Sequence, residues 1–191
     1  MSVAGRLSRE LENDIADAWR AIDAGSSQPI PARRRIPHLS FQPVARGPTP
    51  ALIEDLKALA DEWSPVPIRL GGLGVFEEPR PVLYITVVRS PRLEALQQAV
   101  TLRLADHGHR PDPLYQPEAW VPHVTLAFGT PGIAGWKQLL EQTRQGVFHR
   151  RATVESLLMV STDRRAPLLL EAPFGGTKIQ RPGGDEQNRT P

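Results

Sequence analysis

A short pattern occurs twice in the chain, once in each half: Pro37-His38-Leu39-Ser40-Phe41 and Pro122-His123-Val124-Thr125-Leu126. Each copy has the alternation of polar and apolar side chains that is typical of a half-buried β-strand. Because successive strand side chains point to opposite faces, His38 shares a face with Ser40, and His123 shares a face with Thr125. The chain therefore has to fold around two strands that each carry an apolar face and a face with a histidine and a hydroxyl.

The rest of the chain alternates between strand patterns and segments with apolar residues at helical spacing. This order, without a Gly-rich phosphate loop before a helix, predicts an α+β or α/β domain and argues against P-loop and dinucleotide-binding folds. Gly71, Gly72 and Gly74 fall inside a strand pattern and indicate a bulge or a close approach of backbone. Helices are predicted over 8–24, 50–63, 91–107 and 133–145, the first two capped by Ser8 and Thr49, and strands over 1–7, 36–44, 68–76, 82–88, 120–129, 153–162 and 167–171.

The length of the chain, 191 residues with 40% hydrophobic content, suits one domain with one sizeable core. We expect this domain to cover residues 1–171. From residue 172 to residue 191 the sequence is rich in Gly, Pro and charge and has little to bury, so a disordered C-terminal tail is expected there.

The composition excludes several classes of chemistry. The chain has no cysteine, which rules out disulfides, thiol nucleophiles, thiolate zinc sites and iron–sulfur clusters. No apolar run approaches the roughly 20 residues of a membrane helix, and the start of the chain lacks the apolar stretch of a secretory signal. We therefore expect a cytoplasmic protein without a membrane partner, in which histidine is the obvious catalytic residue.

Positive charge is clustered although the formal net charge is only +2. Such clusters can attract a phosphate backbone, and each can equally be a solvated arginine-rich surface. The first cluster stands out because it directly precedes a histidine motif. The clusters are Arg33-Arg34-Arg35, Arg150-Arg151 and Arg164-Arg165.

Two histidines with two hydroxyls suit the chemistry of a phosphodiester. Opening such a bond requires that a proton leave the attacking oxygen and that another reach the leaving oxygen, and a pair of imidazoles can do both near neutral pH. Ser and Thr hydroxyls can stabilise the charge that develops on the non-bridging oxygens without any metal or cofactor. If the two strands face each other, His38, His123, Ser40 and Thr125 can surround one phosphate group.

Two other classes of function stay open on the residues alone. Some of the five histidines can be ligands of a hydrolytic zinc, although no His-Glu-x-x-His cluster is present and a zinc site does not require the paired hydroxyls. The chain can also be an RNA-binding module that has lost turnover. His107 and His109 lie at a predicted helix end, where histidine suits the helix dipole, so no catalytic role is assigned to them.

The paired motifs resemble those of the 2H phosphoesterases, which include the bacterial 2′-5′ RNA ligase or LigT-like proteins and the 2′,3′-cyclic phosphodiesterases. Their defining feature is a pair of His-x-Thr/Ser-apolar motifs. The stretch from Tyr115 to Ala127, with Trp120-Val121-Pro122-His123 at its centre, is especially similar to the bacterial branch. The first copy departs from the family's usual pattern, with Ser40 and Phe41 where Thr and Leu are more common.

This resemblance implies a bilobed α+β fold, in which two antiparallel sheets flank a central cleft and helices lie outside. It implies that His38 and His123 are catalytic, that Ser40 and Thr125 bind the substrate phosphate, and that no metal or cofactor takes part. The implied substrates are RNA ends or cyclic nucleotides with a 2′,3′-cyclic phosphate, which the enzyme hydrolyses or joins reversibly through a 2′-5′ linkage. We expect a monomer with no obligate protein partner.

Three further residues are candidates for substrate contact. Tyr115 and Trp120 precede the second motif and can stack on a base, with core packing as the favoured use of Trp120. Arg35 can contact a phosphate bidentately, or it can be a solvated arginine at a strand end.

Overall fold

The computed structural model describes residues 1–24, 36–77, 81–129, 133–161 and 167–175. Over these ranges the helices are α1 (Arg9–Ala24), α2 (Pro50–Glu62), α3 (Pro91–Asp106) and α4 (Ile133–Arg144), with short 3₁₀ turns η2 (Pro113–Tyr115) and η3 (Val147–His149). The strands are β1 (Ser2–Leu7), β2 (His38–Pro43), β3 (Val66–Phe76), β4 (Val82–Val87), β5 (His123–Phe128), β6 (Arg151–Val160) and β7 (Leu168–Pro173).

The strands form a connected antiparallel sheet of seven strands in the order β2-β1-β6-β3-β4-β5, with β7 also paired to β6. Strand β3 joins its two parts, because Val66–Arg69 pairs with β6 and the segment from Leu70 onward pairs with β4. One part thus consists of β1, β2, β6 and β7, and the other of β4, β5 and the second half of β3. The predicted α+β class is confirmed, and each part carries one histidine strand.

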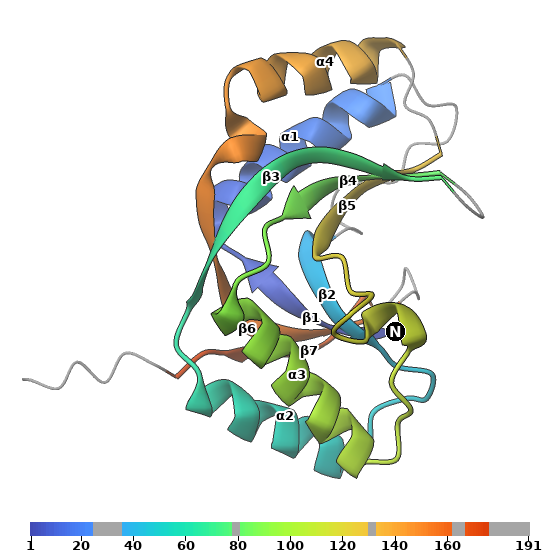
Figure 1. The fold of residues 1–191 in the computed structure, drawn as a ribbon, viewed down its shortest axis with the longest axis vertical. Coiled ribbons are helices and arrows are strands. Elements are labelled where there is room, and N and C mark those ends of the chain that lie inside the picture. Colours follow the sequence, from blue (N-terminus) through green and yellow to red (C-terminus); the bar gives the residue numbers. More distant parts are fainter. Residues whose placement is uncertain (25–35, 78–80, 130–132, 162–166, 176–191) are drawn as a thin grey trace, which may run out of the picture.

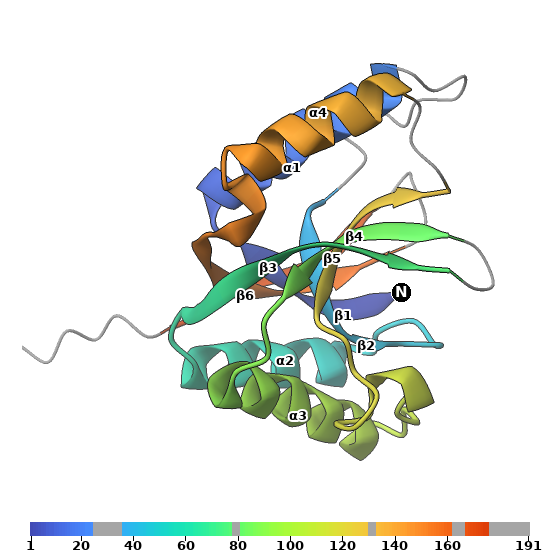
Figure 2. The same cartoon turned by 45° about the horizontal axis from the view of Figure 1, so that its top comes forward.

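A pair of helices covers the outer side of each part of the sheet. In Figures 1 and 2, α1 and α4 lie together beyond β3, β4 and β5, and α2 and α3 lie together beyond β1, β2, β6 and β7. The histidine strands β2 and β5 lie between these outer layers. Over the described ranges, none of the helices is long and apolar enough to cross a bilayer.

The helices form where the sequence supplies caps and an apolar stripe. The Thr49 hydroxyl accepts a hydrogen bond from the Leu52 amide at 3.2 Å, and Pro50 starts α2 with its φ already near the helical value. Ser90 caps α3 in the same way through the Leu93 amide at 3.3 Å. The predicted bounds of these helices agree with the structure to within one residue at each end.

The glycines of β3 produce the bulge that their position predicted. The register of β3 against β4 shifts between Leu70 and Leu73, and Gly72 has φ +99°, a conformation that other residues rarely adopt. Gly74 has a different reason to be glycine, because a Cβ there would lie 2.5 Å from the ring of Tyr84. The bulge falls where β3 passes from one part of the sheet to the other.

Several predicted strand boundaries differ from the structure by two residues or more, and two of these differences have a plain physical cause. The strand expected from Trp120 begins only at His123, because Trp120 belongs to a turn in which its amide donates to the Gln116 carbonyl at 2.8 Å. The folded region also extends beyond residue 171, since β7 runs to Pro173 and Phe174 is buried in the core. Phe174 is therefore part of the core although it lies next to the charged end of the sequence. The rest of the expected tail, 176–191, lies outside the described residues.

Candidate active site

His38 is the first residue of β2 and its ring is held by the backbone just before the strand. Its Nδ1 donates to the Ile36 carbonyl oxygen at 2.7 Å. The side chain is half-buried on the sheet face opposite to Leu39 and Phe41, as the alternation predicted. Across the ladder His38 pairs with Arg6 of β1, so the two side chains share this face.

His123 repeats this arrangement at the start of β5. Its Nδ1 donates to the Val121 carbonyl oxygen at 2.7 Å, again two residues before the histidine. Because a carbonyl can only accept, Nδ1 carries the proton in each neutral ring, and Nε2 is left with a free lone pair. Each imidazole is therefore anchored through Nδ1 and can exchange a proton through Nε2.

Burial lowers the pKa of both histidines. Loss of solvent is the main cause for His38, whose pKa is lowered further by the charge of His123 and raised by its bond to Ile36. Loss of solvent also lowers the pKa of His123, against the opposing effect of the Val121 carbonyl. The influence of the His123 charge on the pKa of His38 indicates that the two rings lie near each other, and burial favours the neutral form of both imidazoles.

The hydroxyls follow the histidines on the same face. Ser40 is half-buried, pairs with Ala4 of β1, and interacts with the phenol of Tyr115, whose pKa it lowers against the larger effect of burial. Burial raises the pKa of Tyr115, so its phenol stays protonated. Thr125 is half-buried and pairs with Tyr84 of β4. All four residues of the two motifs therefore have the predicted facing, and Tyr115, a predicted substrate contact, touches one of them.

Two aromatic rings that the sequence analysis did not predict form a cluster with His123. Phe76 stacks on Tyr84 with ring centroids 4.2 Å apart, and both rings contact the imidazole, at 5.0 Å for Phe76 and 5.2 Å for Tyr84. The register of the strands brings the cluster together, because Tyr84 lies opposite both Gly74 and Thr125. The absence of a side chain at Gly74 leaves room for the Tyr84 ring beside the histidine.

Trp120 packs in the core, as favoured from the sequence. Its side chain is 2% exposed, its ring centroid lies 6.2 Å from that of Phe41, and its Nε1 donates to the Ser40 carbonyl oxygen at 3.3 Å. A ring so enclosed cannot stack on a base. Trp120 instead joins the segment before His123 to the strand of His38.

The other candidates are paired with acidic side chains or lie outside the described residues. Arg35 and the clusters Arg33-Arg34-Arg35 and Arg164-Arg165 fall outside the described residues. Arg150 is engaged in ion pairs with Glu10 and Asp14 of α1, which is a structural role. His107 pairs with Asp55 of α2 at 3.2 Å at the end of α3.

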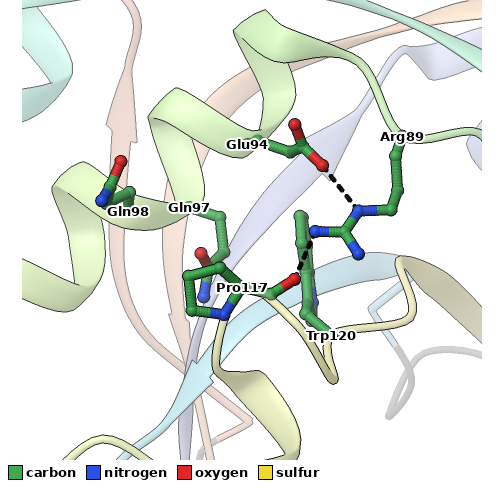
Figure 3. A pocket seen from close by; sticks show the side chains of 6 residues that line it. All are labelled: Arg89, Glu94, Gln97, Gln98, Pro117 and Trp120. Atoms are coloured by element: carbon green, nitrogen blue, oxygen red, sulfur yellow. Dashed lines mark hydrogen bonds and ion pairs between the residues drawn. The ribbon is translucent and has the colours of Figure 1, made fainter.

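Two cavities lie near the histidine strands. The first, of about 190 Å³, lies between α3 and the segment before β5 and contains neither histidine (Figure 3). The second, of about 230 Å³, adjoins the first histidine motif, because Ile36 and Pro37 form part of its lining together with Arg6, Glu12, Asn13, Ala16 and Trp19. Among the described residues, no three histidine, aspartate or glutamate side chains are grouped as metal ligands.

The family of the chain follows from a comparison with known proteins. The sequence pattern of the 2′-5′ RNA ligase superfamily matches residues 7–166, a range that includes both histidine motifs. The chain belongs to the 2′-5′ RNA ligase superfamily. The resemblance to 2H phosphoesterases inferred from the motifs is thereby confirmed.

Solved structures of other proteins show the same fold. TT0787 of Thermus thermophilus is 19% identical, with a TM-score of 0.58 over 92% of this chain and 98% of its own. A protein described as a phosphoesterase is 18% identical, with a TM-score of 0.58 over 91% of this chain and 96% of its own. No curated protein shows a significant match. At these identities the structures establish the fold, and the superfamily match establishes the family.

Proposed function

We propose that this 2′-5′ RNA ligase superfamily member is a metal-independent phosphoesterase that opens 2′,3′-cyclic phosphates of RNA ends or nucleotides by acid–base catalysis with His38 and His123. The observation that carries the proposal is the matched anchoring of the two rings. Each Nδ1 donates to a carbonyl at 2.7 Å, which leaves both Nε2 atoms for proton transfer. A single structural histidine would not need a second copy with the same anchor and the same neighbouring hydroxyl.

In the proposed hydrolysis, one imidazole takes a proton from water as the water oxygen bonds to phosphorus. The bond from phosphorus to one ribose oxygen breaks, and the other imidazole, in its protonated form, gives its proton to that oxygen. The product is a phosphomonoester with a free neighbouring hydroxyl. If a ribose 5′-hydroxyl takes the place of water, the same steps join two RNA ends through a 2′-5′ linkage, and the reverse reaction exchanges the roles of the histidines.

The remaining groups of the site support the charge of this reaction. We assign Ser40 and Thr125 to the non-bridging phosphate oxygens, because each hydroxyl shares a face with its histidine. The phosphate itself favours the imidazolium form and offsets the lowered pKa of one histidine when substrate binds. Tyr115 and the cavity beside Pro37 are candidates for contact with the rest of the nucleotide.

Turnover of 2′,3′-cyclic nucleotides in the presence of EDTA tests the proposal. We expect the wild-type protein to be active, and His38→Ala and His123→Ala each to lose roughly 10²- to 10⁴-fold in kcat. His109→Ala is the matched control, because this histidine lies beyond the end of α3, and it should keep wild-type activity. Loss of wild-type activity in EDTA with recovery on added zinc would instead favour a metal hydrolase, and RNA affinity without turnover a binding module.

A further inference from the structure

The segment that leads into His123 is bonded to the strand that carries His38. The Tyr115 phenol interacts with the Ser40 side chain, and the Trp120 indole donates to the Ser40 carbonyl oxygen at 3.3 Å. These contacts connect parts of the chain that do not pair in the sheet, since β2 and β5 lie at opposite ends of the strand order. Besides the sheet and the direct packing of β2 against β5, the way residues 112–122 are held therefore contributes to the relative position of the two motifs.

Gln97 of α3 holds this segment in place. Its side chain is 3% exposed, and its Nε2 donates to the Tyr115 carbonyl oxygen at 2.7 Å and to the Phe41 carbonyl oxygen at 3.3 Å. Phe41 directly follows Ser40. One buried amide thus binds the backbone on both sides of the contact between Tyr115 and Ser40. In Figure 3 the Gln97 side chain lies beside Pro117 and Trp120, which belong to the segment that leads into His123.

Gln42 of β2 makes a second connection of the same kind. Its side chain is 1% exposed, its Oε1 accepts from the Asp112 amide at 3.0 Å, and its Nε2 donates to the Thr101 hydroxyl at 3.3 Å. Thr101 in turn donates to the Gln97 carbonyl oxygen at 3.0 Å. The two glutamines are therefore linked through Thr101, and together they fix both ends of the stretch from Asp112 to Tyr115.

We propose that Gln97 and Gln42 form a glutamine clamp that positions the two histidine motifs against each other for catalysis. The clamp residues are positioning residues, because they act on the reacting groups through Tyr115, Ser40 and the backbone. A leucine at position 97 would continue the buried stripe of Leu93, Leu96, Val100 and Leu104, so packing alone does not call for an amide there. The inference rests on the proposed two-histidine mechanism for its catalytic consequence.

Gln97→Met tests the clamp, because it keeps most of the side-chain volume and removes the amide donors. We expect kcat for a 2′,3′-cyclic nucleotide to fall on the order of 10- to 100-fold, as for other small misplacements of reacting groups, while KM stays within about 3-fold. Gln98→Met is the matched control, with the same change at the next, exposed residue of α3, and should behave as wild type. A folded Gln97→Met protein with wild-type kcat would overturn the proposal.

A second measurement separates the clamp from the proposed activity. Ring resonances of His38 and His123 can be followed by nuclear magnetic resonance during a pH titration, with no substrate present. If the clamp sets the spacing of the rings, Gln97→Met should raise the pKa of His38, because part of the effect of the His123 charge is lost. If the pKa of His38 differs between Gln97→Met and wild type while the wild-type protein shows no turnover, the clamp is supported and the proposed activity is contradicted. If the pKa of His38 is the same in both proteins, the clamp is contradicted.

Gln97→Glu covers the case in which the methionine variant does not fold. A protonated carboxyl can donate one hydrogen bond to the Tyr115 or Phe41 carbonyl, whereas the carboxylate can only accept. We therefore expect the ratio of Gln97→Glu to wild-type activity to rise as the pH falls through the carboxyl pKa. A ratio that does not change with pH would count against the clamp.

Discussion

The strands β2 and β5 hold their histidines in the same way but surround them differently. In both, a proline lies between the histidine and the residue whose carbonyl accepts a hydrogen bond from the histidine Nδ1. The fixed φ of proline helps to set the distance between this carbonyl oxygen and Nδ1. Beyond this anchor the two sites diverge. His123 contacts the rings of Phe76 and Tyr84, whereas His38 lies across from Arg6, and the nearby apolar cluster of Ala4, Leu158, Val160 and Ile36 has no aromatic ring.

The anchor of each histidine is a local feature, whereas its environment depends on the fold. The anchor arises from three consecutive residues, so both copies have it wherever they lie in the chain. The environment arises from strand pairing, which brings β4 to His123 and β1 to His38. The two histidines thus have the same anchor but lie in two different surroundings.

Removing the two hydroxyls should have the largest effect and tests whether β2 and β5 act on the phosphate in the same way. If Ser40 and Thr125 both stabilise charge on the phosphate, Ser40→Ala and Thr125→Val should each lower kcat/KM on the order of 10²-fold. Steady-state kinetics on a 2′,3′-cyclic nucleotide measures both. A large loss for only one variant would mean that the two strands do not act on the phosphate in the same way.

The pH dependence of kcat/KM tests the lowered pKa of both histidines. The proposed reaction needs one neutral and one protonated imidazole, and burial lowers the pKa of each ring from its ordinary value of 6.5. As the pH rises through these lowered values the acid is lost, so the optimum should lie below pH 6.5. An optimum at or above pH 7 would show that the pKa values of His38 and His123 are not both lowered in the free protein.

Gly74→Ala should disturb the aromatic side of the site and leave the other side intact. The added Cβ would lie 2.5 Å from the Tyr84 ring, and such overpacking costs about 1–3 kcal/mol in the free energy of unfolding. Urea denaturation measures this cost. Gly47→Ala is the control, since no atom lies within 4 Å of its added Cβ. The His123 ring resonances should shift in the Gly74 variant more than those of His38, and equal shifts would contradict the assignment of the aromatic cluster to His123.

Much of the fold could be predicted from local sequence because its signals are local. The Thr49 cap, the proline starts of α2 and α3 and the alternation after His38 each depend on a few neighbouring residues. The facing of the four motif residues followed from the same alternation. The wrong boundary at Trp120 shows the limit, because an apolar residue before a strand looks like part of it until the turn is known.

The parts that were missed depend on contacts between distant segments. The ring cluster of Phe76, Tyr84 and His123 requires the register of three strands. Gln97 had a visible signal, since it falls within the apolar stripe of α3, where a polar residue must find buried partners. Which carbonyls it would meet could not be read from the helix alone.

The most direct test of the central claim is a double-mutant cycle on His38 and His123. Single-turnover rates are measured for wild type, His38→Ala, His123→Ala and the protein with both changes, all in EDTA. If the two rings are acid and base in one step, the second substitution should cost little once the first has been made, so the losses should be far from additive. Losses that multiply, or a loss confined to one histidine, would contradict the paired mechanism.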